Sequence, residues 1–151
     1  MSTPLTRVDV PFIDDLGIDI LDAPRGESRV QLVLLRRHLN SWNVAHGGVI
    51  MTMLDIAMAI AGRSLDPDAR GGVTVEMKTS FLQPGPAGTT LTATGRAFHR
   101  STTMTFCEGE VRDSDERLIA KAMGTFKTLK RLEGASRRLS TAPQAGGGDG
   151  G

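Results

Sequence analysis

The sequence predicts an α+β domain in which an antiparallel sheet wraps around one long helix. Three observations lead to this prediction: a proline-free run of helix formers from Gly48 to about Arg63, stretches of β-branched and aliphatic residues on both sides of it, and turn signals between those stretches. One early helix followed by a run of strands is typical of α+β folds rather than of alternating α/β folds. With 151 residues, the chain has the length of a single domain.

The remaining elements follow from local patterns. A short helix is predicted over Pro11–Leu16, ending at Gly17, and five strands are predicted at Arg29–Arg36, Val73–Leu82, Leu91–His99, Thr102–Arg112 and Leu118–Leu129. The polar turn Asp113–Glu116 should join the last two strands as an antiparallel hairpin. We expect an N-terminal segment at 1–27 that holds the short helix, the main domain at 28–132, and a disordered Gly-rich tail at 133–151.

Charge and cysteine content narrow the functional classes. Eighteen Lys and Arg residues against seventeen Asp and Glu residues leave a net charge of +1, which argues against broad nucleic-acid or membrane-surface binding. A single cysteine, Cys107, excludes a disulfide or thiolate cluster within the chain, and the polar start Met1–Val10 does not resemble a secretory signal. His38 and His99 lack a third ligand for a metal. We therefore expect a cytoplasmic protein without a metal site.

The long helix carries one carboxylate among small residues. Gly48, Thr52, Asp55, Ala59 and Gly62 recur at helical spacing, while most other positions are apolar, which predicts a buried helix with one narrow face. A buried carboxylate is costly unless it is paired. Asp55 therefore has two interpretations: an acceptor for hydrogen bonds from a neighbouring strand or a partner subunit, or a general base or nucleophile.

The start of this helix favours the second interpretation. The first four amides of a helix lack intrahelical acceptors, and the dipole there favours negative charge. Gly47 and Gly48 lack Cβ atoms, so a substrate carbonyl can approach their amides as in an oxyanion hole. A His46-Gly47-Gly48 triplet alone could be a tight turn, but joined to Asp55 it indicates a catalytic site.

These residues resemble the signature of a known family. Asn40, His46-Gly47-Gly48 and Asp55 are spaced as in hotdog-fold acyl-CoA thioesterases of the phenylacetyl-CoA and 4-hydroxybenzoyl-CoA (Arthrobacter-type) group. The similarity continues through Gly72–Met77, Phe81–Pro86, Gly88 and Leu118–Phe126, and covers roughly Val30–Leu129. The resemblance implies a hotdog fold, with a sheet of five or six strands curled around the central helix. It also implies hydrolysis of an aryl- or acyl-CoA thioester to a carboxylic acid and free CoA, with no cofactor.

The resemblance further implies a homodimer, or a tetramer made of two dimers, with the active site between subunits. The Gly47 amide of one chain would polarise the thioester carbonyl, which Asp55 of the other chain would attack directly or through water. Asn40 would hold the water or the carboxylate, and His46 would orient the loop and assist the leaving thiolate. Thr74 falls where relatives carry a hydroxyl that positions water; apart from the family, a solvent-facing strand threonine is an equal interpretation.

The resemblance places the CoA nucleotide near Arg100, Ser101 and Thr102, whose side chains suit phosphate oxygens. Such a turn is otherwise a common surface feature. Trp42 either lines the acyl pocket or lies at an interface. Two other functions stay open: a hotdog hydratase or dehydratase, whose relatives use a different local motif, and a non-catalytic acyl-CoA-binding module. Asp55 argues against the module, because a pocket for an anionic ligand gains nothing from a buried carboxylate.

Overall fold

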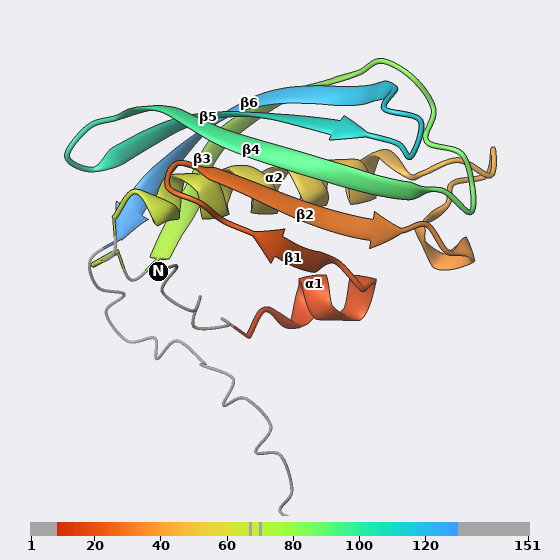
Figure 1. Cartoon of the computed structure of the whole chain (residues 1–151), viewed down its shortest axis with the longest axis horizontal. Helices are drawn as coiled ribbons and strands as arrows, with labels where there is room; N and C mark the ends of the chain where they lie inside the picture. Colours follow the sequence, from red (N-terminus) through yellow and green to blue (C-terminus); the bar gives the residue numbers. More distant parts are fainter. Residues whose placement is uncertain (1–8, 67, 70, 130–151) are drawn as a thin grey trace, which may run out of the picture.

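Six antiparallel strands form one curved sheet over a single long helix (Figure 1). The computed structural model describes residues 9–66, 68–69 and 71–129. The elements are α1 (Pro11–Leu16), β1 (Asp19–Asp22), β2 (Glu27–Val33), the 3₁₀ turn η1 (Arg36–His38), α2 (Gly47–Ser64), β3 (Gly71–Phe81), β4 (Thr90–Arg100), β5 (Met104–Arg112) and β6 (Leu118–Leu129). The strand order is β1-β2-β4-β5-β6-β3. The predicted α+β class and the central helix are confirmed, whereas the tail predicted for 133–151 lies outside the described residues.

Most predicted elements match the structure within two residues. α1 begins at a proline and ends at Gly17, whose φ of 76° is the left-handed conformation that glycine tolerates. The first predicted strand is displaced, because the chain leaves the β4 ladder after Val33 and turns into η1. The fourth predicted strand begins later, at Met104, because Ser101 closes the β4–β5 hairpin. The sequence did not predict β1, which pairs with β2 at one edge of the sheet.

One face of α2 packs against the sheet and forms the core. Its buried residues are Val49, Ile50, Met53, Leu54, Ala57, Met58, Ala61 and Gly62. The helix comes closest to the sheet at Gly95, where a Cβ atom would lie 2.3 Å from the carbonyl oxygen of Ala57. Ser28 marks the same crossing, since its hydroxyl donates a 2.5 Å hydrogen bond to that oxygen. Two small residues of the sheet, Gly95 and Ser28, therefore allow α2 to lie this close to it.

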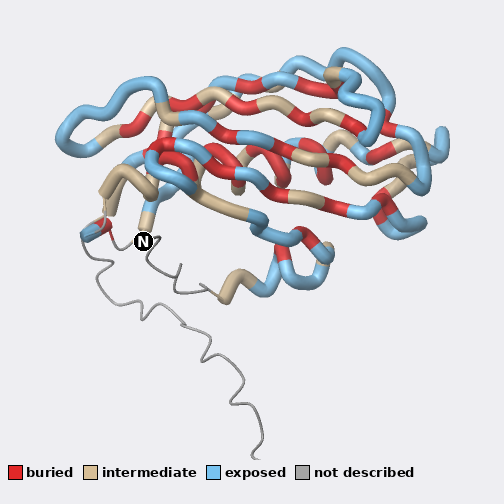
Figure 2. Tube along the Cα trace, viewed as in Figure 1, coloured by how far each residue is buried: buried red, intermediate tan, exposed pale blue. Residues whose placement is uncertain are grey.

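The opposite face of α2 is left partly open. Buried stretches alternate with half-buried ones along α2 (Figure 2). Thr52, Asp55 and Ala59 are half-buried, and Met51 is 39% exposed. The expectation of a helix buried on most sides is thus wrong for this single chain, and Gly62 packs on the sheet instead of sharing the narrow face. By length and composition alone α2 could cross a membrane, but its packed face is the core of this domain.

The edge strand β3 is the second open element. It pairs only with β6, and none of its residues is buried. Val73 and Val75 are 44% and 52% exposed. An edge strand with unpaired backbone groups and exposed apolar side chains is a ready surface for pairing with another strand.

Candidate active site

The start of α2 is shaped by His46, which holds the N-cap position with an extended backbone. Its Nδ1 atom accepts a 2.9 Å hydrogen bond from the Gly48 amide, and its carbonyl oxygen accepts from the amides of Val49 and Ile50. Of the first four helix amides, only that of Gly47 finds no acceptor among the described residues. The Gly47 N–H is therefore a free donor at the positive end of the helix dipole.

The same cap fixes the tautomer of His46 and explains one glycine. Because Nδ1 accepts a hydrogen bond, the proton of the neutral ring lies on Nε2. Nε2–H can therefore donate a hydrogen bond to another group. A Cβ atom at position 48 would lie 3.1 Å from Nδ1, closer than most real contacts. Gly48 thus leaves room for the capping ring, whereas at position 47 a Cβ atom would make an ordinary contact with Phe81 at 3.4 Å.

A tight loop before the helix holds Asn40 beside Gly47. The side-chain Oδ1 of Asn40 accepts hydrogen bonds from the amides of Trp42 at 2.9 Å and Val44 at 3.4 Å. With its oxygen engaged within the loop, the Asn40 side chain retains its NH₂ group as a donor. Asn40 and Gly47 line the same groove, so this donor and the free helix amide belong to one site.

The groove beside Gly47 has a volume of about 380 Å³ and mostly apolar walls. Its lining residues are Asn40, Ala45, Gly47, Ile50, Phe81, Leu82, Gln83, Pro84 and Gly85. Phe81 and Leu82 are 52% and 53% exposed. Neither side chain was predicted as a site residue from the sequence; the signal for them is a pair of large apolar residues where the strand ends. The groove can accommodate an apolar group next to a hydrogen-bond donor.

Asp55 and Thr74 form a second cluster in the middle of α2. The Thr74 hydroxyl donates a 2.6 Å hydrogen bond to Oδ1 of Asp55, although the two residues are 19 positions apart. Asp55 is half-buried in this chain, not buried as expected. Its second carboxylate oxygen keeps acceptor capacity, because an ionised carboxylate has about four lone-pair sites.

A β-bulge in β3 directs Thr74 toward the helix. Thr74 pairs with Phe126 while Glu76 pairs with Thr125, so Val75 is an extra residue in the strand. Phe126 is buried on the helix side, and Thr74 shares that side. Beyond the bulge, Glu76 lies on the outer face, where it accepts a 2.6 Å hydrogen bond from Thr125. Thr74 therefore points toward α2 and Asp55, although it stays exposed in this chain.

The two clusters lie apart within one chain. Gly47 and Asp55 are eight residues apart on the same helix, which at 1.5 Å per residue is about 12 Å. A thioester carbonyl accepting from the Gly47 amide thus lies too far for attack from Asp55 of the same chain. The structure brings together Asn40, His46 and Gly47, and separately Asp55 and Thr74.

The predicted nucleotide-binding residues lie in the β4–β5 hairpin. The Arg100 guanidinium donates to the carbonyl of Leu65 at 3.1 Å and to the carboxylate of Asp66 at 2.6 Å, both at the end of α2. The Ser101 hydroxyl accepts from the Met104 amide at 3.1 Å, and Thr102 is exposed. Arg100 is thus already paired within the chain, and the hydroxyl of Thr102 lies at the surface.

His38 is a fully buried part of the framework of this site. Its Nε2 atom contacts the Leu16 carbonyl at 2.7 Å, and its Nδ1 accepts from the Leu35 amide at 2.9 Å. Its own carbonyl accepts from the His46 amide at 2.8 Å. His38 therefore connects the N-terminal segment, through its ring, to the residue that caps α2, through its carbonyl oxygen. Trp42, by contrast, is 83% exposed on the loop.

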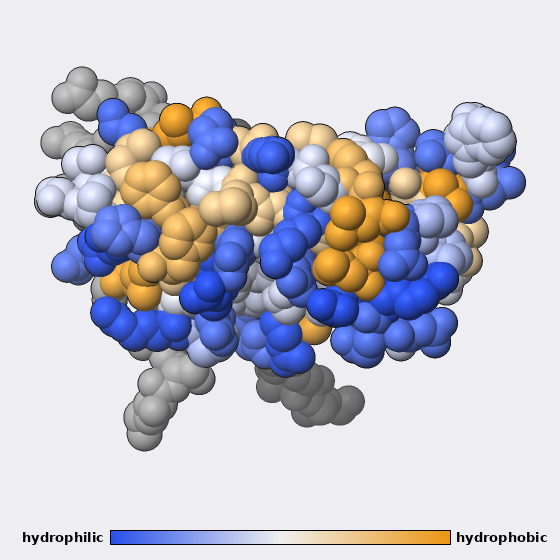
Figure 3. Space-filling view, turned by 90° about the horizontal axis from the view of Figure 1, so that it is seen from above, coloured by the Kyte–Doolittle hydropathy of each residue, from blue (hydrophilic) through white to orange (hydrophobic). Residues whose placement is uncertain are grey.

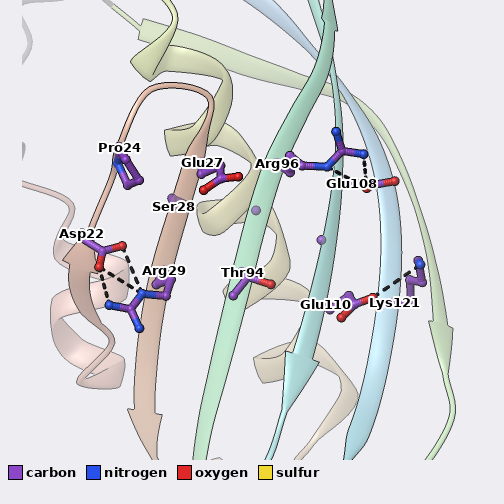
Figure 4. Close-up of a pocket in the computed structure, with 12 residues that line it drawn as sticks. Asp22, Pro24, Glu27, Ser28, Arg29, Thr94, Arg96, Glu108, Glu110 and Lys121 are labelled. Atoms are coloured by element: carbon purple, nitrogen blue, oxygen red, sulfur yellow. Dashed lines mark hydrogen bonds and ion pairs between the residues drawn. The ribbon is translucent and has the colours of Figure 1, made fainter. Parts of the chain in front are cut away.

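A separate hollow of about 370 Å³ lies on the outer face of the sheet, away from α2 (Figure 4). The three cations that line it, Arg29, Arg96 and Lys121, are paired with Asp22, Glu108 and Glu110 respectively. Figure 3, seen from above this face, shows hydrophilic side chains interleaved with separate apolar patches. With its cations neutralised, this hollow offers no free charge for an anionic ligand.

Comparison with known proteins points to one family. Residues 43–120 match the model of the thioesterase superfamily. Acyl-coenzyme A thioesterase PaaI of Escherichia coli (strain K12) is 30% identical over 109 residues, which cover 72% of this chain and 76% of that protein. The 1,4-dihydroxy-2-naphthoyl-CoA hydrolase of Listeria monocytogenes is 27% identical over 119 residues, covering 78% and 95%.

Solved structures agree with these sequence matches. The E. coli PaaI protein, from the phenylacetic acid degradation operon, superposes with a TM-score of 0.75 at 27% identity, covering 80% of this chain and 86% of that one. A Streptococcus mutans protein bound to acetyl-CoA gives a TM-score of 0.69 at 26% identity, covering 74% and 88%. The matched residues 43–120 include Gly47, Asp55 and Thr74.

Proposed function

Because the chain belongs to the thioesterase superfamily and is an acyl-CoA thioester hydrolase, we propose that Gly47 and Asp55 carry its chemistry. The observation that supports this most directly is the free Gly47 amide at the start of the helix that also carries Asp55. The hotdog hydratase and the non-catalytic binding module lose their support, since the named relatives are hydrolases of CoA thioesters.

In the proposed reaction the thioester carbonyl oxygen accepts a hydrogen bond from the Gly47 amide, which stabilises the negative charge that develops there. Asp55 either takes a proton from an attacking water or attacks the carbonyl carbon itself. The C–S bond breaks, and Nε2–H of His46 assists by donating a hydrogen bond to the leaving thiolate. In the water route, the thiolate takes the proton that Asp55 removed from water. In the direct route, a mixed anhydride of Asp55 remains, and water hydrolyses it to release the acid and supply the proton that the thiolate takes. The products are a carboxylic acid and CoA.

Two side chains are assigned supporting roles. The Thr74 hydroxyl donates to one oxygen of Asp55, which orients the other oxygen and leaves it to act. The Asn40 NH₂ group lies in the groove of Gly47, where it can hold the water or the carboxylate of the second chain. The proposed reaction uses no metal or redox cofactor, and we expect it to take place in the cytoplasm.

We propose that the working site is shared between two chains of a homodimer or of a tetramer built from dimers. About 12 Å separates the Gly47 amide from Asp55 within one chain, and a symmetric partner can bring its own Gly47 to Asp55. The open β3 edge and the half-buried outward face of α2 are the surfaces available for this contact.

The acyl group is proposed to lie in the apolar groove next to Gly47. Phe81 and Leu82 offer exposed apolar surface there, which suits an aryl or aliphatic acyl chain. The acetyl-CoA complex of the S. mutans protein and the names of the two relatives support an acyl-CoA substrate without choosing among acyl groups.

The first test measures thiol release from phenylacetyl-, hydroxybenzoyl- and short- to long-chain acyl-CoA, with wild type and Asp55→Ala. We expect turnover to fall by about 100-fold or more in Asp55→Ala. Equal, slow hydrolysis by both proteins across all substrates would contradict the proposal. Single-turnover hydrolysis in ¹⁸O-water separates the two roles of Asp55, because hydrolysis of an anhydride at Asp55 can leave label in its carboxylate.

A second test isolates the Gly47 amide. Proline suits the first position of a helix and an extended preceding residue, so Gly47→Pro removes the N–H with little change in the backbone. We expect kcat to fall about 100- to 1,000-fold in Gly47→Pro. Gly47→Ala is the matched control, because it keeps the N–H and adds a Cβ atom in ordinary contact with Phe81. If both variants lose the same activity, the amide is not the donor.

The third test concerns the shared site. Asp55→Asn and Gly47→Pro are each expected to be inactive alone. After the two proteins are mixed, unfolded and refolded together, half of the dimers are heterodimers with one intact site each, so about a quarter of wild-type activity should return. No recovery, with heterodimers shown by mass spectrometry, would mean that both groups act within one chain.

A further inference from the structure

Two arginines at the C-terminal end of α2 differ in their surroundings. Arg100 is paired with Asp66 and with the Leu65 carbonyl. Arg63, in the last turn of α2, is half-buried and has neither a hydrogen bond nor an ion pair with any residue that the structure describes. Burial lowers the pKa of its guanidinium. The nearby carboxylate of Asp66 is already neutralised by Arg100.

A half-buried guanidinium without a partner is an unusual arrangement. Arginine carries five donors in a rigid fork, and removing them from water is unfavourable unless an anion or carbonyl replaces the lost hydration. The helix dipole favours a cation in the last turn, but it does not supply acceptors for the fork. Arg63 therefore has the properties of a binding group whose anionic partner comes from outside the chain.

The position of Arg63 relative to Asp55 indicates which anion Arg63 binds. The two residues are eight positions apart, about 12 Å along the helix, with a rotation of about 80° between their side chains. Both are half-buried, and both lie off the buried face that packs on the sheet. The pantetheine arm of CoA has about thirteen bonds between sulfur and the first phosphorus, so when extended it reaches about 15 Å.

We propose that Arg63 binds a phosphate group of the CoA part of the substrate, with the pantetheine arm running along the outward face of α2 from Asp55. This inference rests on the proposed function. The planar guanidinium suits bidentate contact with phosphate oxygens. Thr102, on the hairpin that Arg100 joins to the end of α2, has an exposed hydroxyl that would complete the site. Arg100 then acts by holding the hairpin in place and not by direct contact.

The test compares three thioesters of one acyl group, made with CoA, with dephospho-CoA and with pantetheine. We expect Arg63→Gln to raise KM for the CoA thioester about tenfold or more, with kcat little changed. KM for the pantetheine thioester, which has no phosphate, should stay within about twofold of wild type. An effect that persists with dephospho-CoA assigns Arg63 to the pyrophosphate, and one that disappears assigns it to the 3′-phosphate; both results support the proposal.

Arg63→Lys keeps the charge and most of the stem, so it should raise KM for the CoA thioester less than Arg63→Gln does. Arg36→Gln, an exposed residue of η1, is the control and should leave KM unchanged. An unchanged KM for CoA in Arg63→Gln, or an equal rise with pantetheine, would overturn the proposal while leaving the hydrolase function intact. If Arg63→Gln makes the oligomer dissociate in sedimentation, Arg63 pairs with a carboxylate of the second subunit and not with a phosphate. That result would also overturn the proposal. A wild type that hydrolyses none of the three thioesters would overturn both proposals.

Discussion

Replacing Gly95 with alanine would place a methyl group against the backbone of α2. In the native structure a Cβ atom at this position would lie 2.3 Å from the carbonyl oxygen of Ala57 and 2.8 Å from the amide nitrogen of Met58. Real Cβ contacts start near 3.0 Å, so the helix and the sheet must separate by about 0.7 Å. The obstacle is backbone, and no side-chain rotation relieves it.

The cost follows from what that separation removes. The 2.5 Å hydrogen bond from Ser28 to Ala57 is stretched, which costs about 1 kcal/mol. Overpacking a well-packed core costs about 1–3 kcal/mol more, while the reduced flexibility of the unfolded chain returns about 0.5–1 kcal/mol. We expect Gly95→Ala to lower the free energy of unfolding by about 1–3.5 kcal/mol. Catalysis should fall as well, because α2 carries both Gly47 and Asp55.

Urea unfolding at fixed protein concentration measures this difference, since an oligomer's stability depends on concentration. Gly72→Ala is the matched control: it is also a glycine in a strand, and its Cβ atom would lie 3.5 Å from the carbonyl of Lys127, an ordinary contact. We expect the control to change stability by less than about 1 kcal/mol. If Gly95→Ala unfolds at the same urea concentration as Gly72→Ala, the close approach of α2 does not limit the fold.

Three further predictions concern single side chains. The buried Thr79 hydroxyl has no hydrogen-bond partner in the part of the chain that the structure describes, so Thr79→Val should leave urea stability unchanged or raise it by about 1 kcal/mol. A clear loss of stability would mean that the hydroxyl is bonded. Burial raises the pKa of Cys107 to about 11, so a thiol reagent at pH 8 should label it only after unfolding; rapid labelling of the native protein would contradict its burial. Burial alone would raise the pKa of Asp113, but hydrogen bonds and the charge of Arg117 hold it below its usual value. Its stabilising effect is therefore complete above the ordinary aspartate pKa and is lost as the pH falls through the lowered one. Asp113→Asn should show a shallower loss of unfolding free energy in acid, and a slope equal to wild type would refute this.

Elements with strong local signals could be predicted from the sequence. α2 was placed within one residue at each end, because helix formers without proline follow a capping residue and two glycines. β1 was missed because Asp19–Asp22 is only four residues long and has acidic residues at both ends. Its pairing with β2, not its own composition, makes it a strand.

The candidate site was predictable in its residues and not in its contacts. Spacing along one helix identified Gly47 and Asp55, and it also set the distance between them. The hydrogen bond from Thr74 depends on the return of β3 alongside α2, and the pairing of Arg100 with Asp66 joins residues 34 positions apart. Such contacts are set by tertiary packing, which leaves no local pattern. The unpaired state of Arg63 is visible for the same reason only in the folded chain.

The extra residue at Val75 also decides how β3 tolerates a change in length. A strand places alternate residues on alternate faces, so the bulge acts as a shift of phase between its two halves. Deleting Val75 would make Thr74 and Glu76 neighbours, as their partners Phe126 and Thr125 are in β6, and would leave both halves of β3 on their present faces. Straightening the strand with Val75 still present would instead turn Phe81 to the outer face while Thr74 faced α2, because seven positions, an odd number, separate them. The bulge therefore allows Asp55 and Gly47 each to keep a neighbour on β3.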